Sequence, residues 1–334
     1  MKKILSILMT LCLIATISVL SQMQAEAANT ASGKCGKNIT WSFSKKTGTL
    51  TIKGKGEMYD EEHDYTVPWW VSGKGYLDIK KVIIMEGVTS IGAWNFSSCD
   101  KITEIKLPNS LKTIGKYAFY FCGNLKSITL PKNLETIERG AFRQSGLKSV
   151  TIPEKVKNIY SEAFLDCGFL DKVTINGGAV KDVWEGAFHN TKWYNRQADG
   201  LVYIGKYLYD AKGKLSGNLS VKSGTIGIVR GAFNTIEVND GEIRVGDQAR
   251  FYPYDYSEVT KVRIPASVKL IGDGAFAPST PDMEWSIYTG RHFIDLTIVG
   301  HSKSVAEKYA NRYGINFEKL TPTQTRMLCQ SAKL

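Results

Sequence analysis

Residues that build reactive centres are scarce in this chain. Among its 334 residues there are 4 His and 6 Cys, and the sequence contains no HExxH, G-x-S-x-G, P-loop or CxxC motif. No G-x-G-x-x-G stretch lies between a predicted strand and a predicted helix. The usual signatures of zinc, serine-hydrolase and nucleotide chemistry are therefore absent. We expect a protein that is not an enzyme and that has no catalytic residue, bound metal or cofactor.

Dense runs of charge are also rare. The chain carries 43 Lys and Arg against 32 Asp and Glu, a net charge of +11, which favours anionic partners. The basic residues are scattered and no nucleic-acid motif is present, so nucleic acid is not an expected partner. A surface charge that only keeps the protein soluble is the alternative. The acidic run at residues 60–64 lacks the calcium-loop pattern, and we expect a solvated loop there.

The first 27 residues have the pattern of a secretory signal peptide. Lys2 and Lys3 precede an apolar run over residues 4–20, and Ala25-Glu26-Ala27 forms a small-residue cleavage site. The apolar run is short for a bilayer span and ends in a polar segment. We therefore expect cleavage after Ala27, a secreted, extracellular or cell-surface location, and no stable membrane insertion after cleavage. A retained anchor is the alternative.

A unit of about 23 residues recurs along the rest of the chain. It is marked by Phe96, Phe119, Phe142, Phe164, Phe188, Phe233 and Phe276. Upstream of each Phe, apolar residues rich in β-branching stand at i and i+2, the pattern of a short strand with one buried face. These pairs are Val82/Ile84, Ile105/Leu107, Ile128/Leu130, Val150/Ile152, Val173/Ile175, Leu219/Val221 and Val262/Ile264. One such unit cannot bury its own apolar side, so the units are predicted to stack into a solenoid with a continuous core.

Cysteines fall within this register. Cys99, Cys122 and Cys167 each follow a ladder Phe by three residues, a position that Ser145 fills in another unit. We predict small buried fillers rather than reactive thiols, with a Cys99–Cys122 disulfide as the alternative. Five cysteines follow the signal peptide, and this odd number argues against a full disulfide framework. The sequence leaves open whether Cys35 and Cys329 are paired, and it predicts that Lys116 and Tyr117 are merely variable residues between core positions.

The unit LKTIGKYAFYFCGNLKSITLP at residues 111–131 and its copies resemble the leucine-rich repeats of BspA-like bacterial surface proteins. The resemblance extends over nearly all of the chain beyond residue 27. It implies a right-handed leucine-rich-repeat superhelix, a strand-dominated α/β solenoid, over residues 77–320. It also implies an N-terminal β cap at 28–76, an inserted β-hairpin near 194–213, and a terminal strand, helix and strand at 296–320. Two segments near 237–260 and 277–295 are longer than the repeat needs, and residues 321–334 form a polar tail.

Two sets of residues are candidate binding surfaces. Lys106, Thr129, Thr151, Thr174 and Arg263 lie between the inward residues of the predicted strands and would form a column on the sheet face. Ordinary strand propensity is the alternative explanation for this column. The second set comprises the aromatic residues Trp193, Tyr194, Tyr203, Tyr207 and Tyr209 of the insert. These side chains would either contact a partner or cover the end of the core.

The resemblance implies a secreted or surface module for attachment or protein recognition. Its partner would be a protein or glycan at a cell surface or matrix, with acidic ligands favoured by the net charge. The alternative is a carbohydrate-binding or wall-modifying protein on a solenoid scaffold, and such an enzyme needs a carboxylate pair. The candidate carboxylates are Glu104, Asp171, Glu237, Asp240, Glu242 and Asp247.

Overall fold

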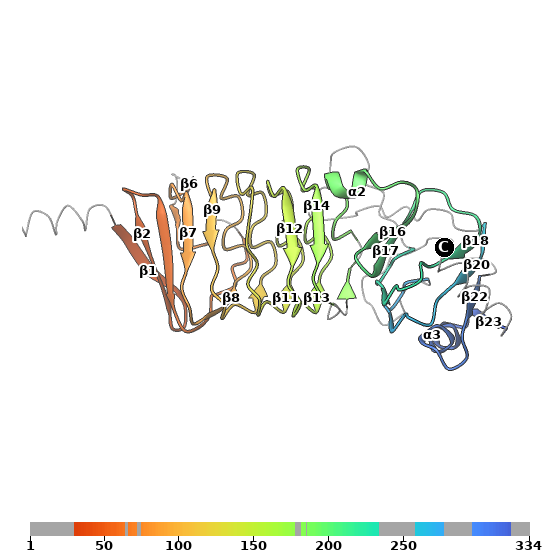
Figure 1. Cartoon of the computed structure of the whole chain (residues 1–334). Coiled ribbons are helices and arrows are strands. Elements are labelled where there is room, and N and C mark those ends of the chain that lie inside the picture. The colour runs from red at the N-terminus through yellow and green to blue at the C-terminus, as the bar shows by residue number, and fades with distance from the viewer. Residues whose placement is uncertain are drawn as a thin grey trace, which may run out of the picture.

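The chain winds into a row of short coils that follow one another along the molecule (Figure 1). The computed structural model describes residues 30–63, 66–71, 75–177, 182–184, 186–233, 258–276 and 296–321. Most coils between residues 81 and 183 place one strand in each of two layers and return through a turn that carries a buried Phe. Units therefore stack as the repeat predicts. The predicted signal peptide, the segment 277–295, most of the segment 237–260 and the tail beyond residue 321 lie outside the described residues.

The first layer begins with antiparallel strands and continues with parallel ones. Its order is β1–β2–β3–β7–β9. These strands are β1 (Thr30–Gly36), β2 (Ile39–Ser44), β3 (Thr49–Gly54), β7 (Lys81–Ile84) and β9 (Glu104–Lys106). Along β2, buried Trp41 and Phe43 alternate with exposed Thr40 and Ser42, as expected for a strand with one buried face. Because β3 pairs in parallel with β7, the antiparallel start is continuous with the first coil.

The second layer is a parallel sheet of very short strands, in the order β15–β13–β11–β10–β8–β4. They are β4 (Gly56–Glu57), β8 (Val88–Ile91), β10 (Thr113–Ile114), β11 (Thr136–Ile137), β13 (Asn158–Ile159) and β15 (Asp182–Val183). The buried residues in register are Ile91, Ile114, Ile137, Ile159 and Val183. The sequence marks these positions as apolar, but two-residue strands are too short to show an alternating pattern. The hairpin of β5 (Trp70–Val71) and β6 (Gly75–Tyr76) precedes the first coil.

The first layer is interrupted in the middle of the coils. The sequence predicts a strand at Ile128 and Leu130, but residues 127–131 form no strand, and this prediction is wrong. As a result β9 ends one sheet, and β12 (Ser149–Ile152) pairs with β14 (Lys172–Ile175) in another. An apolar pattern reports which side chains are buried, but it does not report whether neighbouring backbones approach closely enough to pair. Leu130 is still buried while Ile128 is half-buried, so the core continues beneath a break on the outer face.

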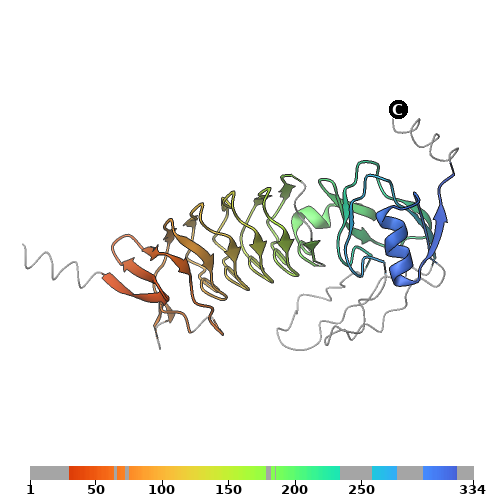
Figure 2. The same cartoon turned by 90° about the horizontal axis from the view of Figure 1, so that it is seen from below.

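The coils become irregular after residue 190. Helix α2 (Lys192–Asn195) leads into the antiparallel strands β16 (Gly200–Ile204) and β17 (Tyr207–Lys212). Strand β17 pairs in parallel with β19 (Gly227–Ile228), and β19 pairs in parallel with β21 (Leu270–Ile271). A further parallel sheet comprises β18 (Gly217–Ser220), β20 (Val259–Arg263), β22 (Thr297–Gly300) and β23 (Asn316–Lys319). Figure 2 shows α3 (Val305–Tyr313) against this last group of strands. The Ser304 side chain caps α3 by accepting a hydrogen bond from the Glu307 amide.

Stacked aromatic rings run through the core of the coils. Consecutive ring centroids in Phe96, Phe119, Phe142, Phe164 and Phe188 lie 5.0 to 5.3 Å apart, with interplanar angles of 4 to 12°. These five residues, called the Phe ladder below, confirm the predicted register. Their backbones are bonded too, since the amide of each of the first four donates to the Ala carbonyl that precedes the next Phe, over 2.7 to 2.8 Å.

Both ends of the Phe ladder are aromatic residues of another type. The Trp69 ring stacks on Phe96 at 5.2 Å, and Tyr209 lies edge-on to Phe188 at 5.7 Å and 76°. The sequence did not predict this role for Trp69, which stands outside the 23-residue register, whereas covering the end of the core is one of the two roles that the sequence offers for Tyr209. Beyond the insert, Phe233 and Phe276 pack at 4.6 Å.

Candidate binding surfaces

The predicted sheet-face residues are distributed over three sheets, and Thr129 lies in the break at residues 127–131. Lys106, Thr129 and Thr151 are exposed and Thr174 is half-buried, and they follow one another from β9 across residues 127–131 to β12 and β14 (Figure 1). Arg263 is half-buried in β20, which belongs to a different sheet. The structure thus brings four of the five predicted residues to one face.

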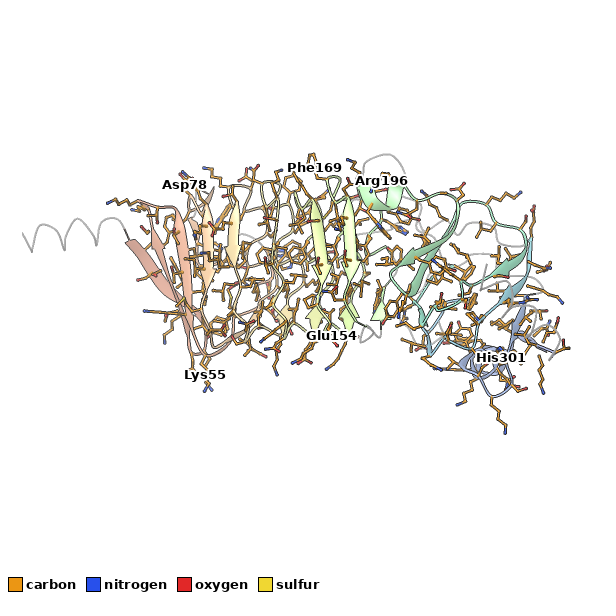
Figure 3. All side chains as sticks on the ribbon, in the orientation of Figure 1. Lys55, Asp78, Glu154, Phe169, Arg196 and His301 are labelled. Atoms are coloured by element: carbon orange, nitrogen blue, oxygen red, sulfur yellow. The ribbon has the colours of Figure 1, made fainter. Side chains whose placement is uncertain are left out.

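A groove opens on this face where the first layer is interrupted. Its volume is about 810 Å³, and Thr129 and Thr151 of the predicted column are among the residues that line it. Its wall also includes half-buried Ile128 and the charged side chains of Glu154 and Lys155. Figure 3 places Glu154 at the long edge of the molecule where the strands of this layer end. Among the described residues, the backbone groups of residues 127–130 make no backbone–backbone hydrogen bond.

Charge on this face is partly paired. Lys81 lies 2.9 Å and Lys106 3.7 Å from the Glu104 carboxylate. The hydrogen bond from Lys81 is the largest cause that lowers the pKa of Glu104 below its ordinary value. Lys126 and Lys148 are exposed on neighbouring coils, so basic side chains remain accessible beside the column.

The aromatic residues of the insert are mostly inside the protein. Tyr194, Tyr207 and Tyr209 are buried, whereas Trp193 and Tyr203 are half-buried. The Tyr209 hydroxyl accepts a hydrogen bond from the Phe188 amide at 2.9 Å, which fixes this ring at the end of the Phe ladder. Three of the five side chains therefore cover the core, and a binding role for the insert remains a prediction for Trp193 and Tyr203.

A polar cluster is buried under the same insert. The Asp210 carboxylate accepts hydrogen bonds from the Tyr194 hydroxyl and from the Ala211 amide, and His189 Nε2 lies 3.0 Å from its Oδ2 atom. His189, Asp210 and Tyr194 are all buried. Since a buried carboxyl group needs such partners, this cluster joins α2 and β17 to the last coil of the Phe ladder.

The cysteine thiols are packed in the core. Cys122 Sγ donates to the Phe96 carbonyl at 3.1 Å and Cys167 Sγ to the Phe142 carbonyl at 3.0 Å. Burial raises the pKa of each of these thiols to about 12, and burial is also the main cause that raises the pKa of Cys35 to about 12. A thiol with such a pKa is a poor nucleophile at neutral pH. Cys329 lies outside the described residues.

The two candidate carboxylates that the structure describes, Glu104 and Asp171, belong to different ion pairs. Glu104 bonds to Lys81 on the sheet face, while Asp171 pairs with Arg196 and Lys192 near α2. The other candidate carboxylates, at positions 237, 240, 242 and 247, lie outside the described residues. No group of three His, Cys, Asp or Glu within the described ranges is arranged to hold a metal ion.

The turns contain a group of aromatic residues that the sequence did not single out. Trp94, Tyr117, Tyr120 and Phe121, here named the turn strip, lie within 4.5 to 6.1 Å of one another between neighbouring centroids. Tyr117, predicted to be merely variable, is 5% exposed, so that prediction is wrong. A comparison of the coils could have found these residues, because Trp94 and Tyr117 stand at a turn position where several other coils have Gly.

Family comparison assigns the regular coils. A BspA-type leucine-rich repeat region matches residues 74–195 with six copies. Residues 74–195 are a BspA-type leucine-rich repeat region. This match confirms the resemblance for the regular coils, over a shorter part of the chain than the resemblance covers. The matched region thus includes α2 and ends with it, before β16, the first strand of the insert.

Solved structures of bacterial leucine-rich-repeat proteins are similar to the chain. A leucine-rich repeat protein from Eubacterium ventriosum is 18% identical, with 82% of this chain and 73% of that chain covered and a TM-score of 0.41. A leucine-rich cell surface protein from Faecalibacterium prausnitzii is 16% identical, with coverages of 89% and 97% and a TM-score of 0.32. The pneumococcal vaccine antigen PcpA is 14% identical, with coverages of 87% and 99% and a TM-score of 0.32. No curated protein matches the chain.

The two helices within the described residues are short. Helix α2 has 4 residues and α3 has 9. Within the described ranges, no helix has the length and apolar character required to cross a bilayer.

Proposed function

We propose that this protein is a non-catalytic recognition module, exported or held at a cell surface, that binds an extended segment of a protein ligand on its sheet face. The observation that carries the proposal is the groove of about 810 Å³ between the coils of Thr129 and Thr151. An elongated repeat stack presents such a face to a partner over several coils.

The groove has the features that an extended peptide requires. Residues 127–130 leave their backbone groups without backbone partners, and extended peptides bind by hydrogen bonds to such groups. Half-buried Ile128 supplies an apolar contact, and Lys132 and Lys155 line the groove with positive charge. A segment with acidic side chains suits this combination, because complementary charge favours association and fixes orientation.

Introducing negative charge into the groove tests the proposal. The double variant Thr129→Glu/Thr151→Glu changes two exposed side chains, so the fold should be retained, while the added carboxylates repel an acidic ligand. The protein would be measured by surface plasmon resonance against immobilised fibronectin, fibrinogen, laminin and collagen. We expect binding to at least one of these probes and a loss of roughly tenfold in the double variant at low salt.

The variant Arg263→Glu is the matched control. It adds negative charge to a sheet-face position on β20, outside the sheet that borders the groove. We expect it to bind as the unchanged protein does. Equal losses in both variants would place the ligand elsewhere, and absence of binding to every probe would contradict the proposed protein recognition.

A further inference from the structure

The turn strip is a compact and partly exposed aromatic surface. The Trp94 and Tyr117 rings are 4.5 Å apart and tilted by 33°, and Tyr120 lies edge-on or nearly so to both, at 6.1 and 5.8 Å. Phe121 follows at 5.9 Å from Tyr120 and is 53% exposed. Trp94 and Tyr120 are half-buried, so Tyr117 is the floor of a surface to which the other three rings contribute.

Two of these residues occupy a backbone position that is unfavourable for large side chains. In each coil, the residue two positions before the buried Phe has a φ of 54 to 70°. The residues there are Trp94, Tyr117, Gly140, Glu162, Gly186, Gly231 and Gly274. Glycine adopts this left-handed conformation without a steric penalty, whereas a bulky side chain strains it. Trp94 and Tyr117 therefore stand where glycine would strain the turn less.

Phe121 repeats this conflict at a second position. Two residues after the buried Phe, φ is again positive, between 53 and 59°, at Ser98, Phe121, Gln144, Asp166 and Asn190. Asn and Asp tolerate this conformation because their short polar side chains bond locally. Phe121 has no such group, and its exposed ring gains little from burial. Strain without compensation inside the fold indicates a functional requirement for the ring.

The neighbouring coil is shaped to receive the turn strip. A Cβ atom at Gly140 would lie 2.1 Å from Cε1 of Tyr117, so the Tyr117 ring covers the backbone of the next turn. Beside it, Arg139 donates to Glu162 at 2.7 Å, and the Tyr117 hydroxyl lies 3.4 Å from the same carboxylate. Exposed Lys116 borders the ring at 5.6 Å. Flat rings and planar hydrogen-bonding groups thus adjoin one another.

We propose that the turn strip is a carbohydrate-binding site, at which sugar rings of a polysaccharide stack on Trp94 and Phe121 and hydroxyl groups bond to the adjoining polar side chains. Sugars present apolar C–H faces together with polar edges, which matches this pairing of rings with Lys116, Arg139 and Glu162. A peptide anchored by apolar side chains needs pockets that exclude water. The turn strip instead offers exposed rings, which favours the sugar.

The strained backbone provides a sharp test. The double variant Trp94→Gly/Phe121→Asn removes two rings and installs residues that tolerate positive φ, as Gly140 and Asn190 do in other coils. Affinity electrophoresis would use the protein with soluble starch, xylan, hyaluronan and solubilised peptidoglycan. We expect retardation by at least one polysaccharide and a loss of roughly tenfold or more in the double variant. Its melting temperature is expected to stay within a few degrees of the original.

Two controls separate the rings from the backbone. Ser98→Gly relieves the same type of left-handed position without removing a ring, and Phe169→Ala removes a 61% exposed ring (Figure 3) outside the turn strip. Both are expected to retain full retardation. Retardation of the double variant equal to that of the original protein would overturn the proposal, as would a lack of retardation by all four polysaccharides.

The site is independent of the groove on the sheet face. The variant Thr129→Glu/Thr151→Glu is expected to lose protein binding while retaining polysaccharide retardation, and Trp94→Gly/Phe121→Asn is expected to do the reverse. Loss of both activities in either variant would point to unfolding, which the melting temperature and the far-ultraviolet circular dichroism spectrum would reveal. Failure of one proposal therefore leaves the other one intact.

Discussion

The Phe ladder and the turn strip are built from similar residues on the same turns, yet they obey different constraints. Rings of the Phe ladder are buried and nearly parallel, with angles of 4 to 12°. The turn strip is confined to two coils, its rings are tilted or edge-on, and three of its four residues have positive φ. Recurrence at every coil marks a structural requirement. A costly residue in a few coils marks a requirement that comes from outside the fold.

Shortening a ladder ring should produce the largest effect. Phe142 is fully buried between Phe119 and Phe164, and Phe142→Ala is expected to reduce the free energy of unfolding by about 3 to 5 kcal/mol. The matched change Phe121→Ala in the turn strip should cost less than about 1 kcal/mol. Urea denaturation of both variants measures the difference, and a loss below about 1 kcal/mol for Phe142→Ala would contradict the ladder.

Arg143 follows Phe142 of the Phe ladder in the chain and lies beside Tyr120 of the turn strip, and its removal should give an intermediate effect. Its side chain is 3% exposed, donates to Glu162 at 2.9 Å, and its guanidinium group lies 6.0 Å from the Tyr120 ring. Arg143→Ala leaves Glu162 without one of its bonds, and we expect a loss of about 1 to 3 kcal/mol in unfolding free energy. Arg139→Ala removes an exposed partner of the same carboxylate and should cost at most about 1 kcal/mol. If urea denaturation gave equal losses of unfolding free energy for Arg143→Ala and Arg139→Ala, burial of Arg143 would add nothing to the strength of its ion pair.

The thiols next to the Phe ladder should give the smallest effect at neutral pH. Because the pKa of Cys122 and Cys167 is about 12 in the folded protein, neither is expected to react with Ellman's reagent at pH 8 until the protein unfolds. Their folded pKa exceeds the ordinary value of a thiol, so their contribution to stability is complete at low pH and is lost as the pH rises from about 9 to 12. The double variant Cys122→Ser/Cys167→Ser should lose less stability over this range in alkaline denaturation. Rapid reaction of Cys122 or Cys167 in the native protein, identified by peptide mapping, would contradict burial of these thiols.

Sequence reasoning succeeded where a pattern recurs many times. The spacing of Phe96 to Phe188 predicted the Phe ladder, and apolar residues at i and i+2 predicted β7, β9, β12 and β14. The outward positions of Lys106 and Thr151 followed directly from the same alternation. Each copy of the unit repeats the same physical requirement, so even short strands become recognisable.

The remaining features depend on backbone geometry that residue types alone do not display. The break at residues 127–131 has the same apolar pattern as its neighbours, and the strands of the second layer are mostly two residues long. Positive φ at Trp94, Tyr117 and Phe121 is hidden because these residues rarely adopt it. The turn strip was therefore invisible until the coils were placed in register.

Edge-on packing of Tyr209 has a consequence for how the number of coils is determined. Each internal boundary between coils of the Phe ladder repeats the same bond from a Phe amide to an Ala carbonyl. Because these boundaries are alike, none of them limits the number of coils that stack. The row of stacked rings ends where the contact is of a different kind. Trp69 stacks nearly parallel on the first Phe, whereas the Tyr209 ring is nearly perpendicular to the last one and does not continue the parallel stack. The length of the Phe ladder is therefore set at its two ends, by the contact of Trp69 with the first Phe and by the contact of Tyr209 with the last one.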